Sequence, residues 1–241
     1  MNDDTSYLFD PVNWAWASPQ SIPHRILEHL EFTALALVIA AAIGIPIGLF
    51  IGHTNRGAFL AINIGNAGRS IPTFGLLSLV VTLIGLGRTP LIFALVVLAV
   101  PPILTTTYAG LRAVDPAAVD AARGMGMRPM QILFRAEVPI ALPLILSGLR
   151  SAALQVVATA TVAAYVGLGG LGRLLVDGLS LNQYDRVVAG AVLVAALAIV
   201  IDLAGSLVQR FVVSPGVSGR VVGVGKASSS TSIPEAAGAP A

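Results

Sequence analysis

The sequence contains no cysteine, and only 11% of its 241 residues are charged. The missing cysteine excludes disulfides and thiolate-ligated metal sites. Soluble domains carry roughly 25% charged residues, so the scarcity of charge excludes an ordinary soluble globule. The net charge of +2 is small and is spread over several loops, which argues against a nucleic-acid-binding surface.

Long apolar stretches take the place of the missing charge. Hydrophobic residues make up 56% of the chain, and several uncharged runs approach or exceed the ~20 residues that cross a bilayer as a helix. We therefore predict an all-α, polytopic membrane protein built as one bundle. The second run contains Arg69, and we expect one long, tilted or broken helix there. The five expected spans are residues 32–52, 57–87, 89–111, 138–165 and 187–209.

The two ends of the chain differ from its apolar middle. Residues 1–26 are acidic and polar, and they lack the basic stretch and short apolar core of a cleavable signal peptide. We expect an extracytoplasmic lead-in, in which Trp14 and Trp16 either anchor at the membrane interface or belong to an ordinary polar segment. Residues 213–241 are rich in Ser, Pro, Gly and Ala, a composition that predicts a disordered cytoplasmic tail.

The distribution of basic residues predicts the orientation, because Lys and Arg accumulate on the cytoplasmic side of membrane proteins. Five spans place the chain's two ends on opposite sides. If residues 112–137 are cytoplasmic, that side carries eight basic residues and the other side four, which predicts the N-terminus outside and the C-terminus inside. The eight are Arg56, Arg112, Arg123, Arg128, Arg135, Arg210, Arg220 and Lys226, and the four are Arg25, Arg88, Arg173 and Arg186.

The polar segment 112–137 lies between two of the longest apolar runs. Asp115 and Pro116 are typical of a helix start, and glycine at 124 or 126 tolerates the left-handed conformation that ends a helix. Pro129 then begins a second short helix that leads into the fourth span. We expect two short helices joined by a glycine corner, with Asp120 and Arg123 on one exposed face.

The side chains of this loop suggest two uses. Ala121 and Ala122 add almost no bulk, and Met125 and Met127 supply adaptable apolar contact. A smooth helix with a tight corner fits the groove of another protein. A linker helix lying on the bilayer surface is equally compatible with these residues.

The loop resembles the Glu-Ala-Ala signature of ATP-binding-cassette (ABC) importer permeases. Asp120-Ala121-Ala122 matches Glu-Ala-Ala, Gly126 matches the signature's glycine, and Ala136-Glu137-Val138-Pro139 matches the later apolar-x-Leu-Pro element. Aspartate in place of glutamate keeps the charge but shortens the reach. Alanine and valine replace the usual isoleucine and leucine, while the proline stays in register.

Residues 26–212 resemble more specifically the osmoprotectant branch of these permeases, which carries glycine betaine, choline, carnitine or proline. The matching stretches include "SIPTFGLLSL", "VDPAAVDAARGMGM" and "VGLGGLG". The resemblance implies a five-helix type I (MetI-like) ABC importer domain over 27–212, with residues 112–137 as a cytoplasmic coupling loop. Betaine-type ligands bind best to aromatic cages, and the chain has two Trp and four Tyr, so we expect selectivity to lie mainly in a binding protein.

The resemblance also implies the partners: a cytoplasmic ABC ATPase dimer, an extracytoplasmic solute-binding protein, a second permease copy or a paralogue, and membrane lipid. ATP and Mg²⁺ are then bound by the ATPase subunit, so this chain is not an enzyme and binds no cofactor or metal itself. The residues implied in coupling to the ATPase are Asp120, Ala121, Ala122, Arg123, Gly124, Met125, Gly126, Pro129, Glu137 and Pro139.

Polar, proline and glycine positions of the spans are candidates for a solute path or gate. Ser147, Ser151, Gln155 and Thr159 recur every four residues and either pack helices together or line the path. Asp202 is expected to form a structural ion pair, with Arg150 as its first candidate partner. The candidates are Arg69, Ser70, Pro72, Pro101, Pro102, Thr105, Arg150, Gln155, Thr159, Gly167, Gly169 and Gly170.

Two glycine motifs are weak matches to nucleotide-binding sites. "GLGGLG" (167–172) follows an apolar helix instead of a strand, so it does not fit a dinucleotide fingerprint, and we expect a flexible outer turn or gate. "GRVVGVGKAS" (219–228) has misplaced glycine spacing and lacks the hydroxyl after Lys226 that holds Mg²⁺ in a P-loop.

Three other functions compete with the osmoprotectant importer. The same architecture serves other small solutes such as amino acids. A secondary transporter is disfavoured because the chain shows no inverted repeat and no series of titratable residues for proton coupling. A membrane enzyme is disfavoured because no base–nucleophile pair is visible, and His24, His29 and His53 lack metal-ligand spacing.

Overall fold

A computed structural model describes residues 7–59, 61, 63–64, 70 and 72–213. The described residues form helices and turns without a strand, which confirms the all-α prediction. The predictions for Arg69, for residues 1–6 and for the tail 214–241, including "GRVVGVGKAS", lie outside the described residues. In chain order the elements are η1 (Pro11–Trp14), α1 (Ile22–Thr54), α3 (Thr73–Ile84), α4 (Arg88–Arg112), α5 (Pro116–Gly124), α6 (Pro129–Ile132), η2 (Leu133–Glu137), α7 (Val138–Ala160), η3 (Thr161–Val166), α8 (Gly172–Ser180) and α9 (Tyr184–Val212).

Four helical stretches in the described part of the chain are long and apolar enough to cross a membrane: α1, α4, the run 129–166 that contains α7, and α9. The second expected span, 57–87, is only partly described. Its helix α3 has 12 residues, and Pro72 before it is extended, with φ −69° and ψ 114°. Because an extended residue interrupts a helix, the broken-helix alternative applies at Pro72.

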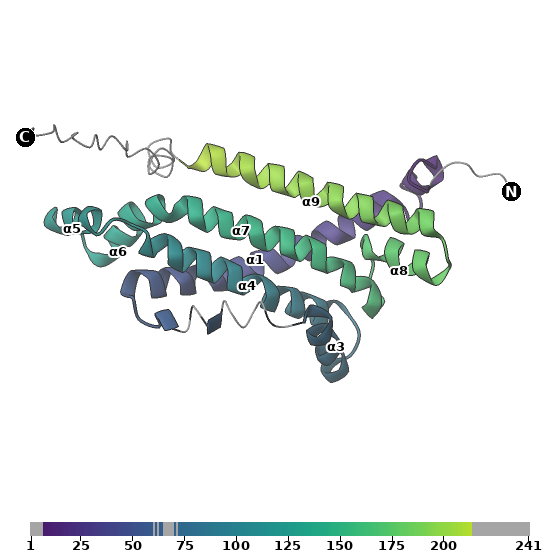
Figure 1. The fold of residues 1–241 in the computed structure, drawn as a ribbon, viewed down its shortest axis with the longest axis horizontal. Helices are drawn as coiled ribbons and strands as arrows, with labels where there is room; N and C mark the ends of the chain where they lie inside the picture. The colour runs from purple at the N-terminus through teal and green to yellow at the C-terminus, as the bar shows by residue number, and fades with distance from the viewer. Residues whose placement is uncertain (1–6, 60, 62, 65–69, 71, 214–241) are drawn as a thin grey trace, which may run out of the picture.

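Helices α1, α4 and α7 pack side by side along most of their length, while α9 lies along α7 and α3 lies beside α4 (Figure 1). The bundle has two ends. Helices α5 and α6 lie at one end, with the C-terminal ends of α1 and α9; we call this the loop end. The N-terminal segment and α8 lie at the other end, which we call the turn end (Figure 1).

Small residues set the contact between α1 and α4. On α1 the buried positions recur every four residues, and on α4 the facing buried positions do the same. In lipid there is little hydrophobic drive to pair helices, so close backbone approach through small side chains replaces it. The α1 positions are Ala36, Ala40, Gly44, Gly48 and Gly52, and the α4 positions are Leu95, Ala99, Ile103, Thr107 and Leu111.

The contact between α1 and α4 leaves no space for additional side-chain atoms at the glycine positions. A Cβ atom added at Gly48 would lie 2.7 Å from Thr107 Cβ, and one added at Gly52 would lie 2.7 Å from Leu111 Cβ. Gly148 on α7 meets the Thr106 side chain in the same way. The three central helices therefore form one closely packed unit.

Two differences from the sequence predictions concern boundaries. Helix α1 begins at Ile22, ten residues before the expected span, because Pro23 in its first turn favours a helix start and the uncharged run is only part of the helix. Helix α8 lies between the fourth and fifth expected spans, where we predicted no helix; its Gly172, Leu174 and Gly178 are buried.

Replacing Gly48 by leucine is expected to destabilise the protein by about 1–3 kcal/mol, because the new side chain must displace α4. The measurement is the thermal unfolding midpoint of the detergent-purified protein. Ala42→Leu is the matched control, since Ala42 lies on the exposed side of the same helix. Equal midpoints for the two variants would contradict the packing described above.

Candidate functional site

The loop between α4 and α7 begins with a capped helix. The carboxylate of Asp115 accepts a hydrogen bond from the Ala117 backbone N–H at 2.9 Å, and Pro116 occupies the first helical position. Helix α5 ends where Gly126 adopts φ +80°, and the Met127 N–H then bonds back to the Ala122 carbonyl at 3.2 Å. Each of these bonds satisfies a backbone group that would otherwise be free at one end of the helix.

The second half of the loop is continuous with a transmembrane helix. Helix α6 begins at Pro129, and the Gln131 side chain accepts a hydrogen bond from the Arg128 N–H at 2.8 Å. A π-helical turn, η2, follows without a break and leads into α7. The expectation of two short helices joined by a glycine corner is confirmed, and the second one is an extension of α7.

Most side chains of the loop face outward. Asp120 and Arg123 form an exposed ion pair at 3.0 Å, as expected from their spacing. Ala121, Gly124, Gly126, Pro129 and Pro139 are also exposed. Ala122 differs from our expectation of a free surface, because it is only 3% exposed; its methyl group packs inward, where no partner protein can reach it.

Three exposed apolar side chains distinguish the loop surface. Met125 is 71% exposed, Met130 63% and Phe134 57%. Met130 and Phe134 are four residues apart and so lie on one side of the same helical segment. Sequence reasoning identified Met125 but missed the other two, which read as ordinary members of an apolar run.

Glu137 lies at the junction of the loop and α7 and is nearly buried. Its Oε2 atom is 2.5 Å from Nδ1 of His53, at the C-terminal end of α1. The exposed fractions of the two side chains are 10% and 19%. Sequence reasoning assigned Glu137 to the loop but gave His53 no role, since 84 residues separate the two.

The glycine turn, residues 167–170, lies at the turn end of the bundle. Gly167 and Gly170 adopt φ +77° and +83°, and the Gly170 N–H donates to Glu28 Oε2 at 2.8 Å. A Cβ atom at Gly169 would collide with the same carboxylate. The glycine turn is thus hydrogen-bonded to the N-terminal part of α1, and so it is not a freely flexible loop. Its role as a gate stays a prediction.

Arg150 on α7 and Asp202 on α9 form the ion pair that we expected from the sequence. Arg150 Nε and Nη2 each lie 2.5 Å from a carboxylate oxygen of Asp202, and the Arg150 stem lies beside Gly205 of α9. The Gln209 amide donates to the Pro143 carbonyl at 3.2 Å nearby. These polar contacts fix α9 against α7.

The other predicted path residues do not meet at one point. Ser70 and Pro72 are exposed. Pro101 is buried within α4, Pro102 is half-buried, and Thr105 donates back to the Pro101 carbonyl at 2.8 Å. On α7, Ser147 and Ser151 are exposed while Gln155 and Thr159 are half-buried. The α7 stripe therefore faces away from the tightest helix contacts of this chain.

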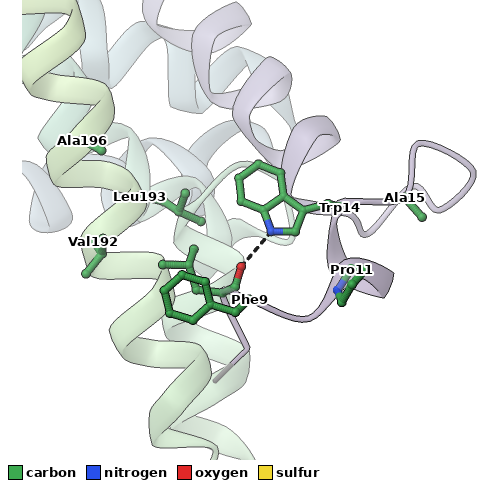
Figure 2. A pocket seen from close by; sticks show the side chains of 8 residues that line it. Phe9, Pro11, Trp14, Ala15, Val192, Leu193 and Ala196 are labelled. Carbon is green, nitrogen blue, oxygen red and sulfur yellow. Dashed lines mark hydrogen bonds between the residues drawn. The ribbon is translucent and has the colours of Figure 1, made fainter. Parts of the chain in front are cut away.

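An apolar pocket lies elsewhere, between the N-terminal segment and α9 (Figure 2). The indole N–H of Trp14 donates to the Leu8 carbonyl at 2.8 Å beside it. None of the predicted path residues lines it. Its lining is Leu8, Phe9, Pro11, Trp14, Ala15, Val192, Leu193 and Ala196.

Residues 44–214 match a protein family described as "Binding-protein-dependent transport system inner membrane component". The choline transport system permease protein OpuBB of Bacillus subtilis is 33% identical over 78% of this chain and 86% of that protein. The glycine betaine/carnitine/choline permease OpuCB of the same organism is 33% identical, with 80% and 88% covered. The osmoprotectant import permease OsmY of Salmonella typhimurium is 35% identical, with 73% and 75% covered.

A solved structure shares the fold. A chain from an inward-facing conformation of the MetNI methionine ABC transporter superposes with a TM-score of 0.70 at 26% identity, covering 85% of this chain and 99% of that one. The expected type I ABC importer fold is thereby confirmed.

Removing either partner of the Arg150–Asp202 pair is expected to lower the thermal unfolding midpoint, because an unpaired charge then remains in a span. The double variant Arg150→Ala/Asp202→Ala is expected to be more stable than either single variant. Gln209→Ala removes a neutral contact between the same two helices and is expected to have a smaller effect. Strictly additive losses in the double variant would show that the pair is not coupled.

Proposed function

The chain belongs to the family of binding-protein-dependent transport system inner membrane components, and on this premise we propose that it is the permease subunit of an ABC importer for compatible solutes. The solute class is glycine betaine, choline, carnitine or proline. The observation that carries the proposal is the 33–35% identity to choline, glycine betaine, carnitine and osmoprotectant permeases over about three quarters of the chain.

The loop is the proposed docking site for an ATPase subunit. Capping by its own side chains makes it a stiff element outside the bundle, and it presents Met125, Met130 and Phe134 to a partner. Methionine adapts to a groove with little cost. Because α6 continues into α7, force applied to the loop reaches a transmembrane helix directly. ATP and Mg²⁺ are bound by that partner, so this chain hydrolyses nothing itself.

The loop end is the proposed cytoplasmic side. At the turn end all four arginines pair with carboxylates: Arg25 with Glu28, Arg88 with Glu31, and Arg173 and Arg186 with Asp177. At the loop end, five exposed arginines form no ion pair with another described residue. Unpaired basic side chains favour the cytoplasmic face. The five are Arg56, Arg112, Arg128, Arg135 and Arg210.

A second permease copy or a paralogue is the proposed partner within the membrane. The stripe of Ser147, Ser151, Gln155 and Thr159 forms no side-chain hydrogen bond with another described residue, and half of it is exposed. Polar groups facing lipid are costly. A facing stripe on another subunit would enclose a polar path, and a solute-binding protein would deliver solute at the turn end.

A second candidate function is import of an amino acid by the same mechanism. It is favoured by the structural likeness to the methionine transporter chain, although the sequence identity there is lower than to the osmoprotectant permeases.

Uptake into proteoliposomes that contain this chain with its ATPase subunit and binding protein tests the solute class. We expect ATP-dependent accumulation of at least one of choline, glycine betaine, carnitine and proline, and none of methionine. Accumulation of methionine alone would favour the second candidate. Accumulation without the ATPase subunit would refute the importer.

Gly126→Ala is expected to reduce solute-stimulated ATP hydrolysis, because a left-handed alanine costs about 1–2 kcal/mol and the corner between the two loop helices must change. Gly124→Ala is the matched control: both glycines have open space around a Cβ atom, but only Gly126 has a positive φ. Membrane insertion is expected to be unchanged in both. A similar loss of stimulation in the two variants would show that the corner conformation is not needed.

A further inference from the structure

Helix α1 is bonded to the α7 region at both of its ends. At the loop end His53 contacts Glu137, the last residue of the π-helical turn that precedes α7. At the turn end Glu28 accepts the Gly170 N–H, in the turn that follows η3. Between Glu28 and His53, α1 is a single helix, which at 1.5 Å per residue spans about 38 Å.

The contact at the loop end is built to transmit displacement. The His53 ring and the Glu137 carboxylate are in direct hydrogen-bond contact, at 2.5 Å. The surrounding burial protects it from water, since Glu137 is 7% exposed as a whole residue. Glu137 ends the η2 turn that follows α6, so the second half of the loop and this carboxylate belong to one continuous helical segment.

The contact at the turn end is equally specific. Glu28 bonds to the backbone of Gly170, and a Cβ atom at Gly169 would displace the Glu28 carboxylate from this position. One turn of α1 is further secured because the Nε2–H of His29, which is fully buried, donates to the Val157 carbonyl of α7 at 2.9 Å. The glycine turn therefore follows the N-terminal part of α1.

The covalent route along the chain from the loop to the glycine turn is less direct than the route through α1. From the loop to the glycine turn it runs along α7, then through the 3₁₀ segment Thr161–Val166, then through Gly167 at φ +77°. A change of helix type and a left-handed glycine are places where a backbone absorbs movement. Helix α1 bypasses both; Pro46 removes one of its own hydrogen bonds, but the glycine face on either side of Pro46 is packed against α4 and leaves α1 little room to bend alone.

We propose that α1 carries the movement of the coupling loop to the glycine turn, with Glu137, His53 and Glu28 as the positioning residues that connect it at its two ends. The proposal rests on the proposed function, because it requires an ATPase subunit that moves the loop. It goes beyond that function in assigning the transmission to α1 and to two hydrogen bonds, each of which can be removed separately.

The test uses the natural absence of cysteine. Leu168→Cys places one thiol in the glycine turn at a half-buried position. In proteoliposomes holding the complete transporter, the rate of labelling by an impermeant maleimide is measured with and without ATP and vanadate. We expect nucleotide to change the rate, and we expect Glu137→Ala, His53→Ala and Glu28→Ala each to reduce that change about fivefold or more.

Conservative variants separate positioning from folding. Glu137→Gln and Glu28→Gln keep an acceptor oxygen for the His53 and Gly170 N–H groups, so they are expected to preserve the response. Glu31→Ala, which removes an exposed pair with Arg88 on the same helix, is also expected to preserve it. Only variants that co-purify with the ATPase subunit are compared. If Glu137→Ala does not assemble with that subunit, His53→Ala removes the same contact and replaces it in the test.

The proposal is overturned if the labelling rate of His53→Ala or Glu137→Ala changes with nucleotide as fully as that of the Leu168→Cys parent. It is also overturned if the labelling rate of the parent does not change with nucleotide although the ATPase subunit is bound. Failure of the parent chain to bind the ATPase subunit at all refutes the proposed function instead.

Discussion

The close approach of α1 to α4 is the constraint on which the other features depend. Lipid is as apolar as the side chains, so the hydrophobic effect does not drive these helices to pair. Their contact must come from close approach of the backbones, which glycine at 44, 48 and 52 allows. This fixes the axial position of α1. His53 and Glu28 thereby come within hydrogen-bond distance of Glu137 and Gly170, although nothing in their local sequence directs them there.

The loop of residues 112–137 obeys a different constraint, because it leaves the bundle and has only a small apolar cluster, in which Val114 and Leu133 pack against the start of α7, to order it. Asp115 caps its first helix, Gly126 turns the corner, and Gln131 caps the second. The outcome is a stiff element attached to α7 by an unbroken helical segment. Local bending alone cannot absorb a displacement that a partner imposes on this element. Part of the displacement must therefore pass into the membrane-spanning helix α7.

Local chemistry made part of this structure predictable from sequence. The Asp115 cap, the glycine corner and the bounds of α4 depend on residues within a few positions of one another, and each was predicted. The Arg150–Asp202 pair was predicted too, because a lone charge in a span requires a partner. The contacts of Glu137 and Glu28 were not, since they join residues 84 and 142 positions apart. The burial of Ala122 likewise depends on tertiary packing.

The aromatic residues bear on where solute is selected. A quaternary ammonium group is gripped by several ring faces around one point. In the described part of the chain the contacts between two rings are isolated edge-to-face pairs, Phe74 with Tyr165 and Trp16 with His24. The Phe32 and Tyr7 rings each lie beside one arginine of the protein itself. Two rings that meet edge to face do not surround a cation. If the proposed function holds, we therefore expect discrimination among solutes to lie mainly in the partner that delivers the solute.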